Sequence, residues 1–363
     1  MKVLEIIDVY KHGGAEKVYD AYNSFCQEKN IVLDRFTIYK SDILTLNYLI
    51  ENNSDGLIQK IMQQLKGSQK LAYIISNQNY DKIVSFLDRS NIMAIIATKG
   101  KIPVIATVHN PPTVQYQKLG HLKIIVFALL QYFYNKKNVR VIAVSKQVEE
   151  SLLSIGIKNV KIVYNPLCIK KCNDNLLLPK HYFVSIGRLS YQKAHWKLIK
   201  AISILKTKYK KIIHCVIVGD GELLEQAKKL SNALGVEDFI HFTGYIENPY
   251  LIIKNAYCMI FTSYFEGFPI TVLEAFHCNT PVIGAKVAIP DEIRKEIAYS
   301  DFYYQNQNMA ENFQSSTFEE DDYTIANIIL KAIDSKTALN FIAKKGNKWV
   351  SENCSLSNFE NYN

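Results

Sequence analysis

The sequence predicts an α/β protein made of two doubly wound domains, and three observations lead to this prediction. The chain has 363 residues, a length more typical of two domains than of one. Short apolar runs rich in β-branched residues alternate with helical patterns, as expected for parallel sheets covered on both faces. The alternation breaks at residues 165–180, where two prolines and polar residues without a clear period predict an interdomain linker.

The first half of the chain contains a series of predicted strands separated by helical patterns. The predicted strands are Lys2–Tyr10, Val32–Tyr39, Lys82–Leu87, Pro103–Val108, Val139–Val144 and Lys161–Tyr164. Helical periodicity is clearest in Ala15–Glu28, Gly56–Ile75 and Lys146–Ile155. Together these elements predict an amino-terminal Rossmann-like domain over residues 1–165.

The same alternation restarts after the linker. The predicted strands are His181–Ile186, His214–Val218, Phe239–Phe242, Cys258–Thr262 and Pro281–Gly284. Strong helical patterns at Lys193–Tyr209 and Glu222–Leu234 lie between them. These elements predict a second Rossmann-like domain over residues 180–340. Ligands of such sheets bind beyond the carboxyl ends of the strands, so these ends are where functional residues are expected.

Composition favours a globular protein with an anionic partner. The 43 basic and 34 acidic residues give a net charge of +9, which suits nucleotide phosphates, lipid head groups or nucleic acid. Nucleic acid is disfavoured because the lysines are dispersed rather than clustered with aromatic residues. Of seven cysteines only Cys168 and Cys172 lie close together, so we expect reduced thiols and no zinc site.

The amino-terminal residues MKVLEIIDVYKHGG contain too short an apolar run for a signal peptide. No stretch approaches the ~20 apolar residues that a membrane span requires. A cytoplasmic protein is therefore expected.

The most informative segment is SYFEGFPITVLEAFHCNTPV, residues 263–282. Glu266 and Glu274 are separated by seven residues, and the run Ile270–Phe276 predicts a helix. Pro269 suits the helix start because proline has no backbone N–H to leave unpaired. Both carboxylates and the helix-start amides can face one pocket that binds hydroxyls and an anion. A sugar nucleotide presents both kinds of group.

A basic loop, GRLSYQK at residues 187–193, follows the predicted strand His181–Ile186. Arg188 and Lys193 bracket this loop just before a helix, where two cations can clamp a diphosphate. The alternative is a solvated basic loop without a ligand.

Two further motifs follow strands of the first half. HGGAE at residues 12–16 is a strand-to-helix turn in which glycine lets backbone amides approach a phosphate, although it can also be only a tight connection. His109 follows the strand Pro103–Val108. It can contact a phosphate or sugar hydroxyl, or hold its own loop by a hydrogen bond, and without further context the structural role is favoured.

Taken in order, four motifs resemble those of retaining glycosyltransferases of the family 4 type, the glycosyl transferases group 1. The motifs are GGAE, VSIGRLSYQK (184–193), VGDGEL (218–223) and EGFPITVLEA (266–275), and the resemblance spans about residues 3–285. It implies the GT-B fold, with two facing Rossmann-like domains and an interdomain cleft. The domain at 1–165 is then the acceptor side, the domain at 180–340 binds the nucleotide sugar, and the tail at 341–363 returns toward the first domain.

The resemblance also implies roles for single residues. Arg188 and Lys193 bind the donor diphosphate, Glu274 accepts hydrogen bonds from the ribose, and Glu266 contacts the donor sugar. His109 matches a family histidine close to the transferred sugar, which raises the weight of its functional role. Arg188, Lys193, Glu266 and His109 are thus the expected catalytic residues. The other expected substrate-binding residues are Gly14, Gly187, Gly267, Phe268, Pro269, Ile270, Thr271 and Glu274.

The implied activity is that of a retaining hexosyltransferase. It moves a sugar from a nucleoside-diphosphate donor, expected to be UDP-linked, to a glycan or lipid-linked acceptor in the synthesis of lipopolysaccharide, O-antigen or another cell-surface polysaccharide. No cofactor or metal is expected, because no Asp-x-Asp motif follows a strand and the basic pair replaces a divalent cation. In the front-side attack proposed for this family the leaving phosphate takes the acceptor proton, so no general base is assigned.

Two alternatives keep the same fold but change the function. The chain can be a non-catalytic protein that binds sugar nucleotides, or a sugar-nucleotide epimerase. The Arg188/Lys193 and Glu266/Glu274 pairs are both present, which argues against a site that has lost catalytic activity. The sequence shows no signature of the acid/base carboxylates that an epimerase needs. Two departures from the family pattern are the run GAKVAIPDEI in place of a glycine-rich turn, and the absence of an Asn-Gly-Leu segment in residues 297–321.

One apolar run has two readings of equal weight. Residues Leu122–Tyr134, LKIIVFALLQYFY, predict either a core helix of the first domain or a helix lying on a membrane surface. The second reading implies peripheral attachment to the anionic inner leaflet of the membrane. The basic residues that flank the run are Lys118, Lys123, Lys136, Lys137 and Arg140.

Overall fold

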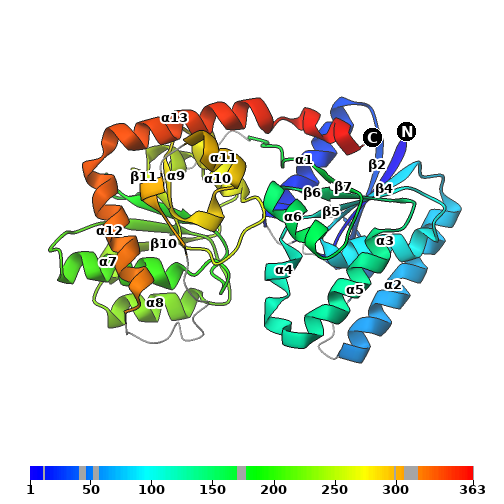
Figure 1. Cartoon of the computed structure of the whole chain (residues 1–363), viewed down its shortest axis with the longest axis horizontal. Helices are drawn as coiled ribbons and strands as arrows, with labels where there is room; N and C mark the ends of the chain where they lie inside the picture. Colours follow the sequence, from blue (N-terminus) through cyan, green and yellow to red (C-terminus); the bar gives the residue numbers. More distant parts are fainter. Residues whose placement is uncertain are drawn as a thin grey trace. The chain divides into compact units, whose positions relative to one another are not determined.

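The computed structural model describes residues 1–10, 13–40, 46–51, 57–169, 177–297, 300–305 and 318–362. The chain forms two compact units (Figure 1). The first unit contains Met1–Cys168 and Cys354–Asn363, and the second contains Ile169–Asn353. The division falls inside the expected linker, of which residues 170–176 lie outside the described part of the chain.

The first unit is built on a seven-stranded parallel sheet with the order β3-β2-β1-β4-β5-β6-β7. Its strands β4 and β5 are buried along their whole length because helices cover both of their faces. The order reverses between β1 and β4, which makes this the topological switch point of the sheet. The strands are β1 (Lys2–Ile7), β2 (Val32–Tyr39), β3 (Asn47–Ile50), β4 (Lys82–Phe86), β5 (Val104–Val108), β6 (Val139–Ala143) and β7 (Val160–Ile162).

The helices of the first unit lie on both faces of its sheet (Figure 1). Helix α3 packs against α2 and α5, whereas α1 packs against the last residues of the chain. The helices are α1 (Gly14–Glu28), α2 (Leu57–Asn77), α3 (Asp88–Thr98), α4 (Pro112–Gln115), α5 (Lys123–Tyr134), α6 (Lys146–Ser154) and the 3₁₀ helices η1 (Gln117–Leu122) and η5 (Leu356–Tyr362).

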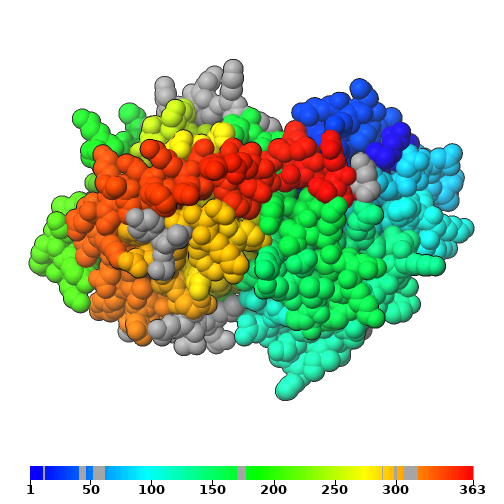
Figure 2. All heavy atoms as spheres, turned by 45° about the horizontal axis from the view of Figure 1, so that its top comes forward, coloured from blue at the N-terminus to red at the C-terminus, as the bar shows by residue number. Residues whose placement is uncertain are grey.

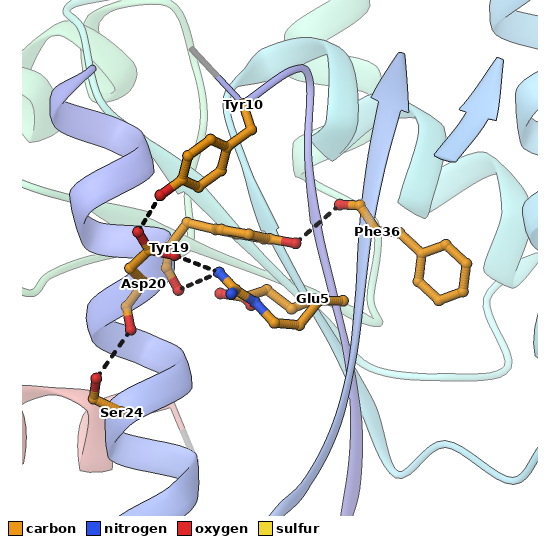
Figure 3. Close-up of polar contacts among 7 residues, drawn as sticks. Glu5, Tyr10, Tyr19, Asp20, Ser24 and Phe36 are labelled. Atoms are coloured by element: carbon orange, nitrogen blue, oxygen red, sulfur yellow. Dashed lines mark hydrogen bonds and ion pairs between the residues drawn. The ribbon is translucent and has the colours of Figure 1, made fainter. Parts of the chain in front are cut away.

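A charged cluster joins α1 to strands β1 and β2 (Figure 3). Arg35 on β2 donates from Nε to Glu5 on β1 at 2.9 Å and from Nη2 to Asp20 on α1 at 2.8 Å. Its guanidinium lies 4.0 Å from the ring centroid of Tyr19, whose hydroxyl donates to the carbonyl of Phe36. The cluster fixes α1 on the sheet.

The second unit has a six-stranded parallel sheet with the order β10-β9-β8-β11-β12-β13. Its switch point lies between β8 and β11. The strands are β8 (Phe183–Ile186), β9 (Cys215–Val218), β10 (Ile240–Gly244), β11 (Cys258–Phe261), β12 (Val282–Ala285) and β13 (Tyr303–Tyr304). The helices are α7 (His195–Thr207), α8 (Leu224–Ala233), α9 (Tyr250–Asn255), α10 (Ile270–His277), α11 (Asp291–Ile297), α12 (Glu320–Asp334), α13 (Lys336–Asn353) and the 3₁₀ turns Glu237–Phe239, Lys286–Ala288 and Ser300–Phe302.

Helix α7 begins at His195, two residues later than its sequence pattern predicts. Ala194 has a φ of 49°, a left-handed conformation that ends the loop and cannot belong to a helix. Two lysines of α7 are buried under α12 with acidic partners. Lys197 Nζ lies 2.5 Å from Asp321 Oδ2, and Lys200 Nζ lies 3.9 Å from Asp322 Oδ2. These pairs explain how most of the helix is buried although it carries charges.

The end of the chain belongs to the first unit (Figure 2). The rings of Phe359 and Tyr362 pack on Tyr22 of α1, with centroids 5.1 Å and 5.7 Å away. Lys82 Nζ on β4 donates to the carbonyl of Tyr362 at 3.1 Å. The last helical turn thus completes the hydrophobic core on this face of the first sheet.

Candidate active site

The basic loop after β8 and the loop after β11 meet at the switch point of the second sheet. Lys193 Nζ donates to Glu266 Oε1 at 2.6 Å, and both side chains are largely buried. β8 and β11 are neighbours in the sheet, so the loops that follow them are adjacent although 73 residues separate the pair. The structure therefore brings together two of the four expected catalytic residues.

Further hydrogen bonds join the same two loops. Thr262 Oγ1 donates to the carbonyl of Lys193 at 2.8 Å, and the Tyr264 amide donates to the carbonyl of Gln192 at 2.9 Å. Gln192 Nε2 in turn donates to the carbonyl of Phe265 at 2.8 Å. Lys193 and Glu266 are consequently held by backbone contacts on both sides, which preorganises the pair.

Glycines allow the loops after β8 and β9 to touch. A Cβ atom at Gly219 would lie 2.1 Å from the carbonyl oxygen of Gly187, and the φ of Gly219 is 142°. At Gly187 a Cβ atom would lie 3.3 Å from the side-chain carbons of Lys193. The lysine therefore folds back over the glycine, which explains why a residue without a side chain stands there. Arg188, next to Gly187, is exposed on this loop.

Glu274 lies on α10, behind the turn that carries Glu266. Pro269 is the residue just before the helix, with φ −70° and ψ 115°, and it is one position earlier than a first helical residue. Glu274 is 1% exposed, and its Oε1 accepts a hydrogen bond from the Tyr250 hydroxyl at 3.4 Å. Phe268 and Ile270 are buried, so their side chains pack into the second unit rather than face solvent.

In the first unit, His109 follows β5 and is buried. Its Nε2 lies 3.0 Å from Thr107 Oγ1, and that hydroxyl donates to the carbonyl of Ser85. Thr107 therefore accepts from His109, which assigns the proton to Nε2 and leaves Nδ1 as an acceptor. Burial lowers the pKa of His109 to about 4, so the ring is neutral at neutral pH. This hydrogen bond holds the ring in place, and among the described residues no hydrogen bond to Nδ1 is found. A contact of His109 with a ligand stays a prediction.

Gly14 is the first residue of α1, and Gly13 before it is extended. A Cβ atom at Gly13 would lie 2.5 Å from the carboxylate of Glu16, so the GGAE turn closes on its own acidic residue. His12, which opens this motif, lies outside the described residues.

Sequence reasoning missed two carboxylates of the first unit. Asp8 follows β1 and accepts hydrogen bonds from the amide and hydroxyl of Ser90 at 2.9 Å and 2.6 Å. Asp88 follows β4 and accepts from the hydroxyls of Tyr116 and Tyr134, each at 2.7 Å. The available signal was an aspartate directly after a buried strand, in the run EIIDVY.

Within the described ranges, no group of three or more His, Cys, Asp or Glu side chains is placed to hold a metal ion.

Comparison with known families matches most of the chain. Residues 56–170 match the family model described as Glycosyltransferase Family 4, and residues 173–312 match Glycosyl transferases group 1. The first match falls almost entirely within the first unit, and the second match falls within the second unit.

Several curated relatives are glycosyltransferases. An uncharacterized glycosyltransferase of Methanocaldococcus jannaschii is 31% identical over 241 residues, which cover 61% of this chain and 59% of that protein. An α-1,4-N-acetyl-D-galactosaminyltransferase of Campylobacter jejuni, which acts on a diphospho-undecaprenol-linked glycan, is 26% identical over 306 residues, 80% of this chain and 82% of that one. The chain spans 59% of the archaeal relative and 64% of a second Campylobacter jejuni relative, less than two thirds of either protein.

Solved structures share the fold at low sequence identity. HepE of Anabaena, solved with UDP and glucose, has a TM-score of 0.74 and 17% identity, with 100% of this chain and 98% of that chain covered. WaaG, a glycosyltransferase of lipopolysaccharide biosynthesis, has a TM-score of 0.73 and 12% identity, with the same coverage. The family and fold expected from the motifs are therefore confirmed: the chain belongs to the glycosyltransferases of the family 4 type, and its two Rossmann-like units are those of the GT-B fold.

Proposed function

We propose that the chain is a retaining hexosyltransferase that uses a UDP-linked sugar as donor. The acceptor is a glycan or lipid-linked saccharide in the synthesis of lipopolysaccharide, O-antigen or another cell-surface polysaccharide. The observation that carries the proposal is the buried pair of Lys193 and Glu266 at the switch point of the second sheet. A cation beside a hydroxyl-binding carboxylate suits a ligand that joins a diphosphate to a sugar.

The proposed chemistry needs charge stabilisation rather than a metal. The bond between the anomeric carbon and the donor phosphate oxygen breaks, and its electron pair leaves with the nucleoside diphosphate. Lys193 and Arg188 stabilise this charge, while the acceptor oxygen bonds to the anomeric carbon and its proton passes to the leaving phosphate. Attack from the face of departure retains the configuration.

The remaining residues hold the donor. Glu266 uses Oε1 to orient Lys193, and its Oε2 is assigned to a hydroxyl of the donor sugar. Glu274, buried on α10, is assigned to the ribose hydroxyls. His109 is assigned to a sugar hydroxyl through Nδ1, because a neutral ring with its proton on Nε2 accepts a hydrogen bond there.

The names of similar proteins support the choice of donor and acceptor. Solved structures of HepE contain UDP, glucose or UDP-glucose. Relatives in Campylobacter jejuni act on undecaprenol-linked saccharides, and relatives in Salmonella typhimurium and Escherichia coli are lipopolysaccharide 1,6-galactosyltransferases.

We test the donor assignment by nucleoside diphosphate release from a panel of UDP-, GDP- and dTDP-sugars. Arg188→Ala and Lys193→Ala are expected to lower turnover by about 10²-fold or more, the scale of losing a preorganised charge partner. Glu266→Ala is also expected to lower release. Lys228→Ala is the matched control, since Lys228 is 46% exposed on α8 and pairs with its neighbour Glu225.

Addition of EDTA is expected to leave turnover unchanged, because the two basic side chains supply the charge. Release from no donor, or release that Glu266→Ala does not affect, would contradict the transferase proposal. Loss of activity in EDTA that Mg²⁺ or Mn²⁺ restores would contradict only its metal independence.

We further propose that the protein attaches peripherally to an anionic membrane surface through α5. Among the described helices, none is long and apolar enough to cross a bilayer. Only Leu130 and Tyr134 of α5 are buried. This pattern disfavours a core helix for the run Leu122–Tyr134. The exposed apolar side chains are Leu122, Ile124, Ile125, Leu129 and Tyr132, between 49% and 64% exposed. Basic residues flank this surface, which matches the charge of anionic lipid head groups.

A further inference from the structure

The switch point of the first sheet carries a carboxylate to which the mechanism above assigns no role. The strand order reverses between β1 and β4, and ligands of doubly wound sheets bind outside the carboxyl ends of strands at such a point. Asp8 comes directly after β1, and residues 87–90 come directly after β4. The side chains that follow these two strands are therefore the first candidates for a binding site in this unit.

Asp8 is anchored through one oxygen only. Its Oδ1 accepts both hydrogen bonds from Ser90, at 2.9 Å from the amide and 2.6 Å from the hydroxyl. Its Oδ2 has no hydrogen-bond partner among the described residues, and the side chain is half-buried. Asp88 differs, because Tyr116 and Tyr134 occupy both of its oxygens. Asp88 is thus a structural anchor, whereas Asp8 has an acceptor left for a ligand.

Two contacts hold the residues directly after β1. The carbonyl of Asp8 accepts from the Tyr39 amide at 3.0 Å. Two residues later, the Tyr10 hydroxyl donates to Asp20, which Arg35 holds in the cluster of Figure 3. The open oxygen is consequently fixed in place before any ligand binds, as expected of a binding residue.

The surroundings of Asp8 disfavour its charge. Burial raises its pKa to about 6, and the nearby Asp88 also acts to raise it, whereas the bonds from Ser90 and the charge of Arg89 act to lower it. Asp8 is thus a carboxylate held where burial and a neighbouring acidic residue act against its ionised form.

We propose that Asp8 Oδ2 accepts a hydrogen bond from a hydroxyl of the acceptor saccharide, which makes Asp8 an acceptor-binding residue of the first unit. The inference rests on the proposed glycosyltransferase function. A saccharide fits better than an anion because the open group is a carboxylate oxygen, which binds hydroxyl donors and repels phosphate. The end of the neighbouring strand β4 supports this role for Asp8. Phe86 is the last residue of β4, and its ring lies 5.9 Å from the ring of His109. His109 is the residue assigned above to a sugar hydroxyl.

The test is Asp8→Asn, which has the same shape and keeps an oxygen for the two bonds from Ser90. Transfer is measured to octyl glucoside, octyl galactoside and octyl N-acetylgalactosaminide with the donor found in the screen. We expect kcat/KM for the acceptor to fall about 10- to 100-fold, mainly through the acceptor KM, as for loss of a hydrogen bond to a charged group. Donor KM and donor hydrolysis without acceptor are expected to stay unchanged.

The pH profile separates ligand binding from a structural role. In the wild type, kcat/KM for the acceptor is expected to rise as pH increases through about 6, because the ionised carboxylate is the better acceptor. In the Asp8→Asn variant this rise is expected to disappear. The thermal midpoint of the variant at pH 8 is expected to equal or exceed that of the wild type. Asp34→Asn is the control, since Asp34 is a partly exposed carboxylate near the amino end of β2 that accepts a hydrogen bond from the Tyr80 hydroxyl.

The outcomes distinguish the two proposals. No nucleoside diphosphate release by the wild type contradicts the transferase function itself. If the wild type releases it, an unchanged acceptor KM in Asp8→Asn overturns the role of Asp8 alone. Release without transfer to any of the three glycosides also overturns that role.

Discussion

His195 shows how burial of one side chain sets the response of the second unit to acid. It is the first residue of α7, is 4% exposed, and its Nδ1 has no hydrogen-bond partner among the described side chains. Burial lowers its pKa to about 3, and the positive charge of Lys193 contributes to the lowering. The ring therefore stays neutral in the folded unit at a pH where the unfolded chain binds a proton.

The difference between the folded and unfolded pKa of His195 makes the second unit less stable in acid. Because the folded pKa lies below the unfolded value of about 6.5, His195 costs no stability above that pH and destabilises the fold as pH falls below it. Between pH 7 and pH 5 the loss is about 2 kcal/mol in the free energy of unfolding. His195→Phe is expected to abolish this part of the loss, as measured by urea unfolding at both pH values.

Comparison with the wild type isolates His195 from other titrating groups. Asp322 has a pKa raised to about 6, so its contribution changes in the opposite direction and increases stability as pH falls toward 4. It is present in both proteins and cancels from the difference. Equal losses of stability in wild type and His195→Phe would show that His195 is protonated in the fold.

Helix α5 has an apolar surface that its own unit does not cover. Periodicity alone could not assign this helix, because nearly every residue of the run is apolar and no polar face marks the solvent side. The neighbouring α3 and η1 contact it, yet only Leu130 and Tyr134 are buried. Tyr134 anchors the end of the helix by donating to Asp88, so α5 is fixed to the unit at one end.

Charge on this surface is expected to weaken binding to a membrane. Ile124→Glu combined with Ile125→Glu replaces two side chains that are 63% and 59% exposed. In flotation with anionic liposomes at low salt we expect the bound fraction to fall about tenfold or more, because two apolar contacts are lost and negative charge is added. Added salt is expected to weaken wild-type binding as well.

Leu153→Glu is the matched control, since Leu153 is 49% exposed on α6 of the same unit. It is expected to leave flotation unchanged. Failure of the wild type to float with anionic liposomes at low salt would contradict the membrane proposal.

The residues after α13 pack in the core of the first unit and contribute to its stability. Helix α13 belongs to the second unit up to Asn353, whereas the chain from Cys354 onward belongs to the first. Phe359 and Tyr362 are 1% and 2% exposed, so they are core residues of a unit whose other segment ends at Cys168. The core of the first unit therefore depends on residues that follow the whole second unit in the sequence.

Phe359→Ala is expected to destabilise the first unit selectively. Loss of a buried phenylalanine costs about 3–5 kcal/mol. Hydrogen exchange is expected to become faster in α1 and β1 and to stay unchanged in β8 and β9 of the second unit. Phe341→Ala on α13, where the ring is 41% exposed, serves as the control. Unchanged exchange in α1 would contradict the placement of the tail in the core of this unit.

Local patterns were sufficient for most of the fold. Apolar runs such as β4 and β5 were predicted because both of their faces are buried. The edge strands β3 and β13 were missed because they have only four and two residues and lack a buried run. The Glu266 to Glu274 spacing and the GRLSYQK loop indicate the family without reference to any contact.

Tertiary structure alone decided which of these residues act together. Lys193 and Glu266 are 73 residues apart, and Asp8 and Ser90 are 82 apart, so only the order of strands in each sheet brings them into contact. The open oxygen of Asp8, the tautomer of His109 and the exposure of α5 follow from contacts of the same kind. Sequence periodicity reports a residue's neighbours three or four positions away, whereas burial and hydrogen bonding depend on segments that the strand order places beside it.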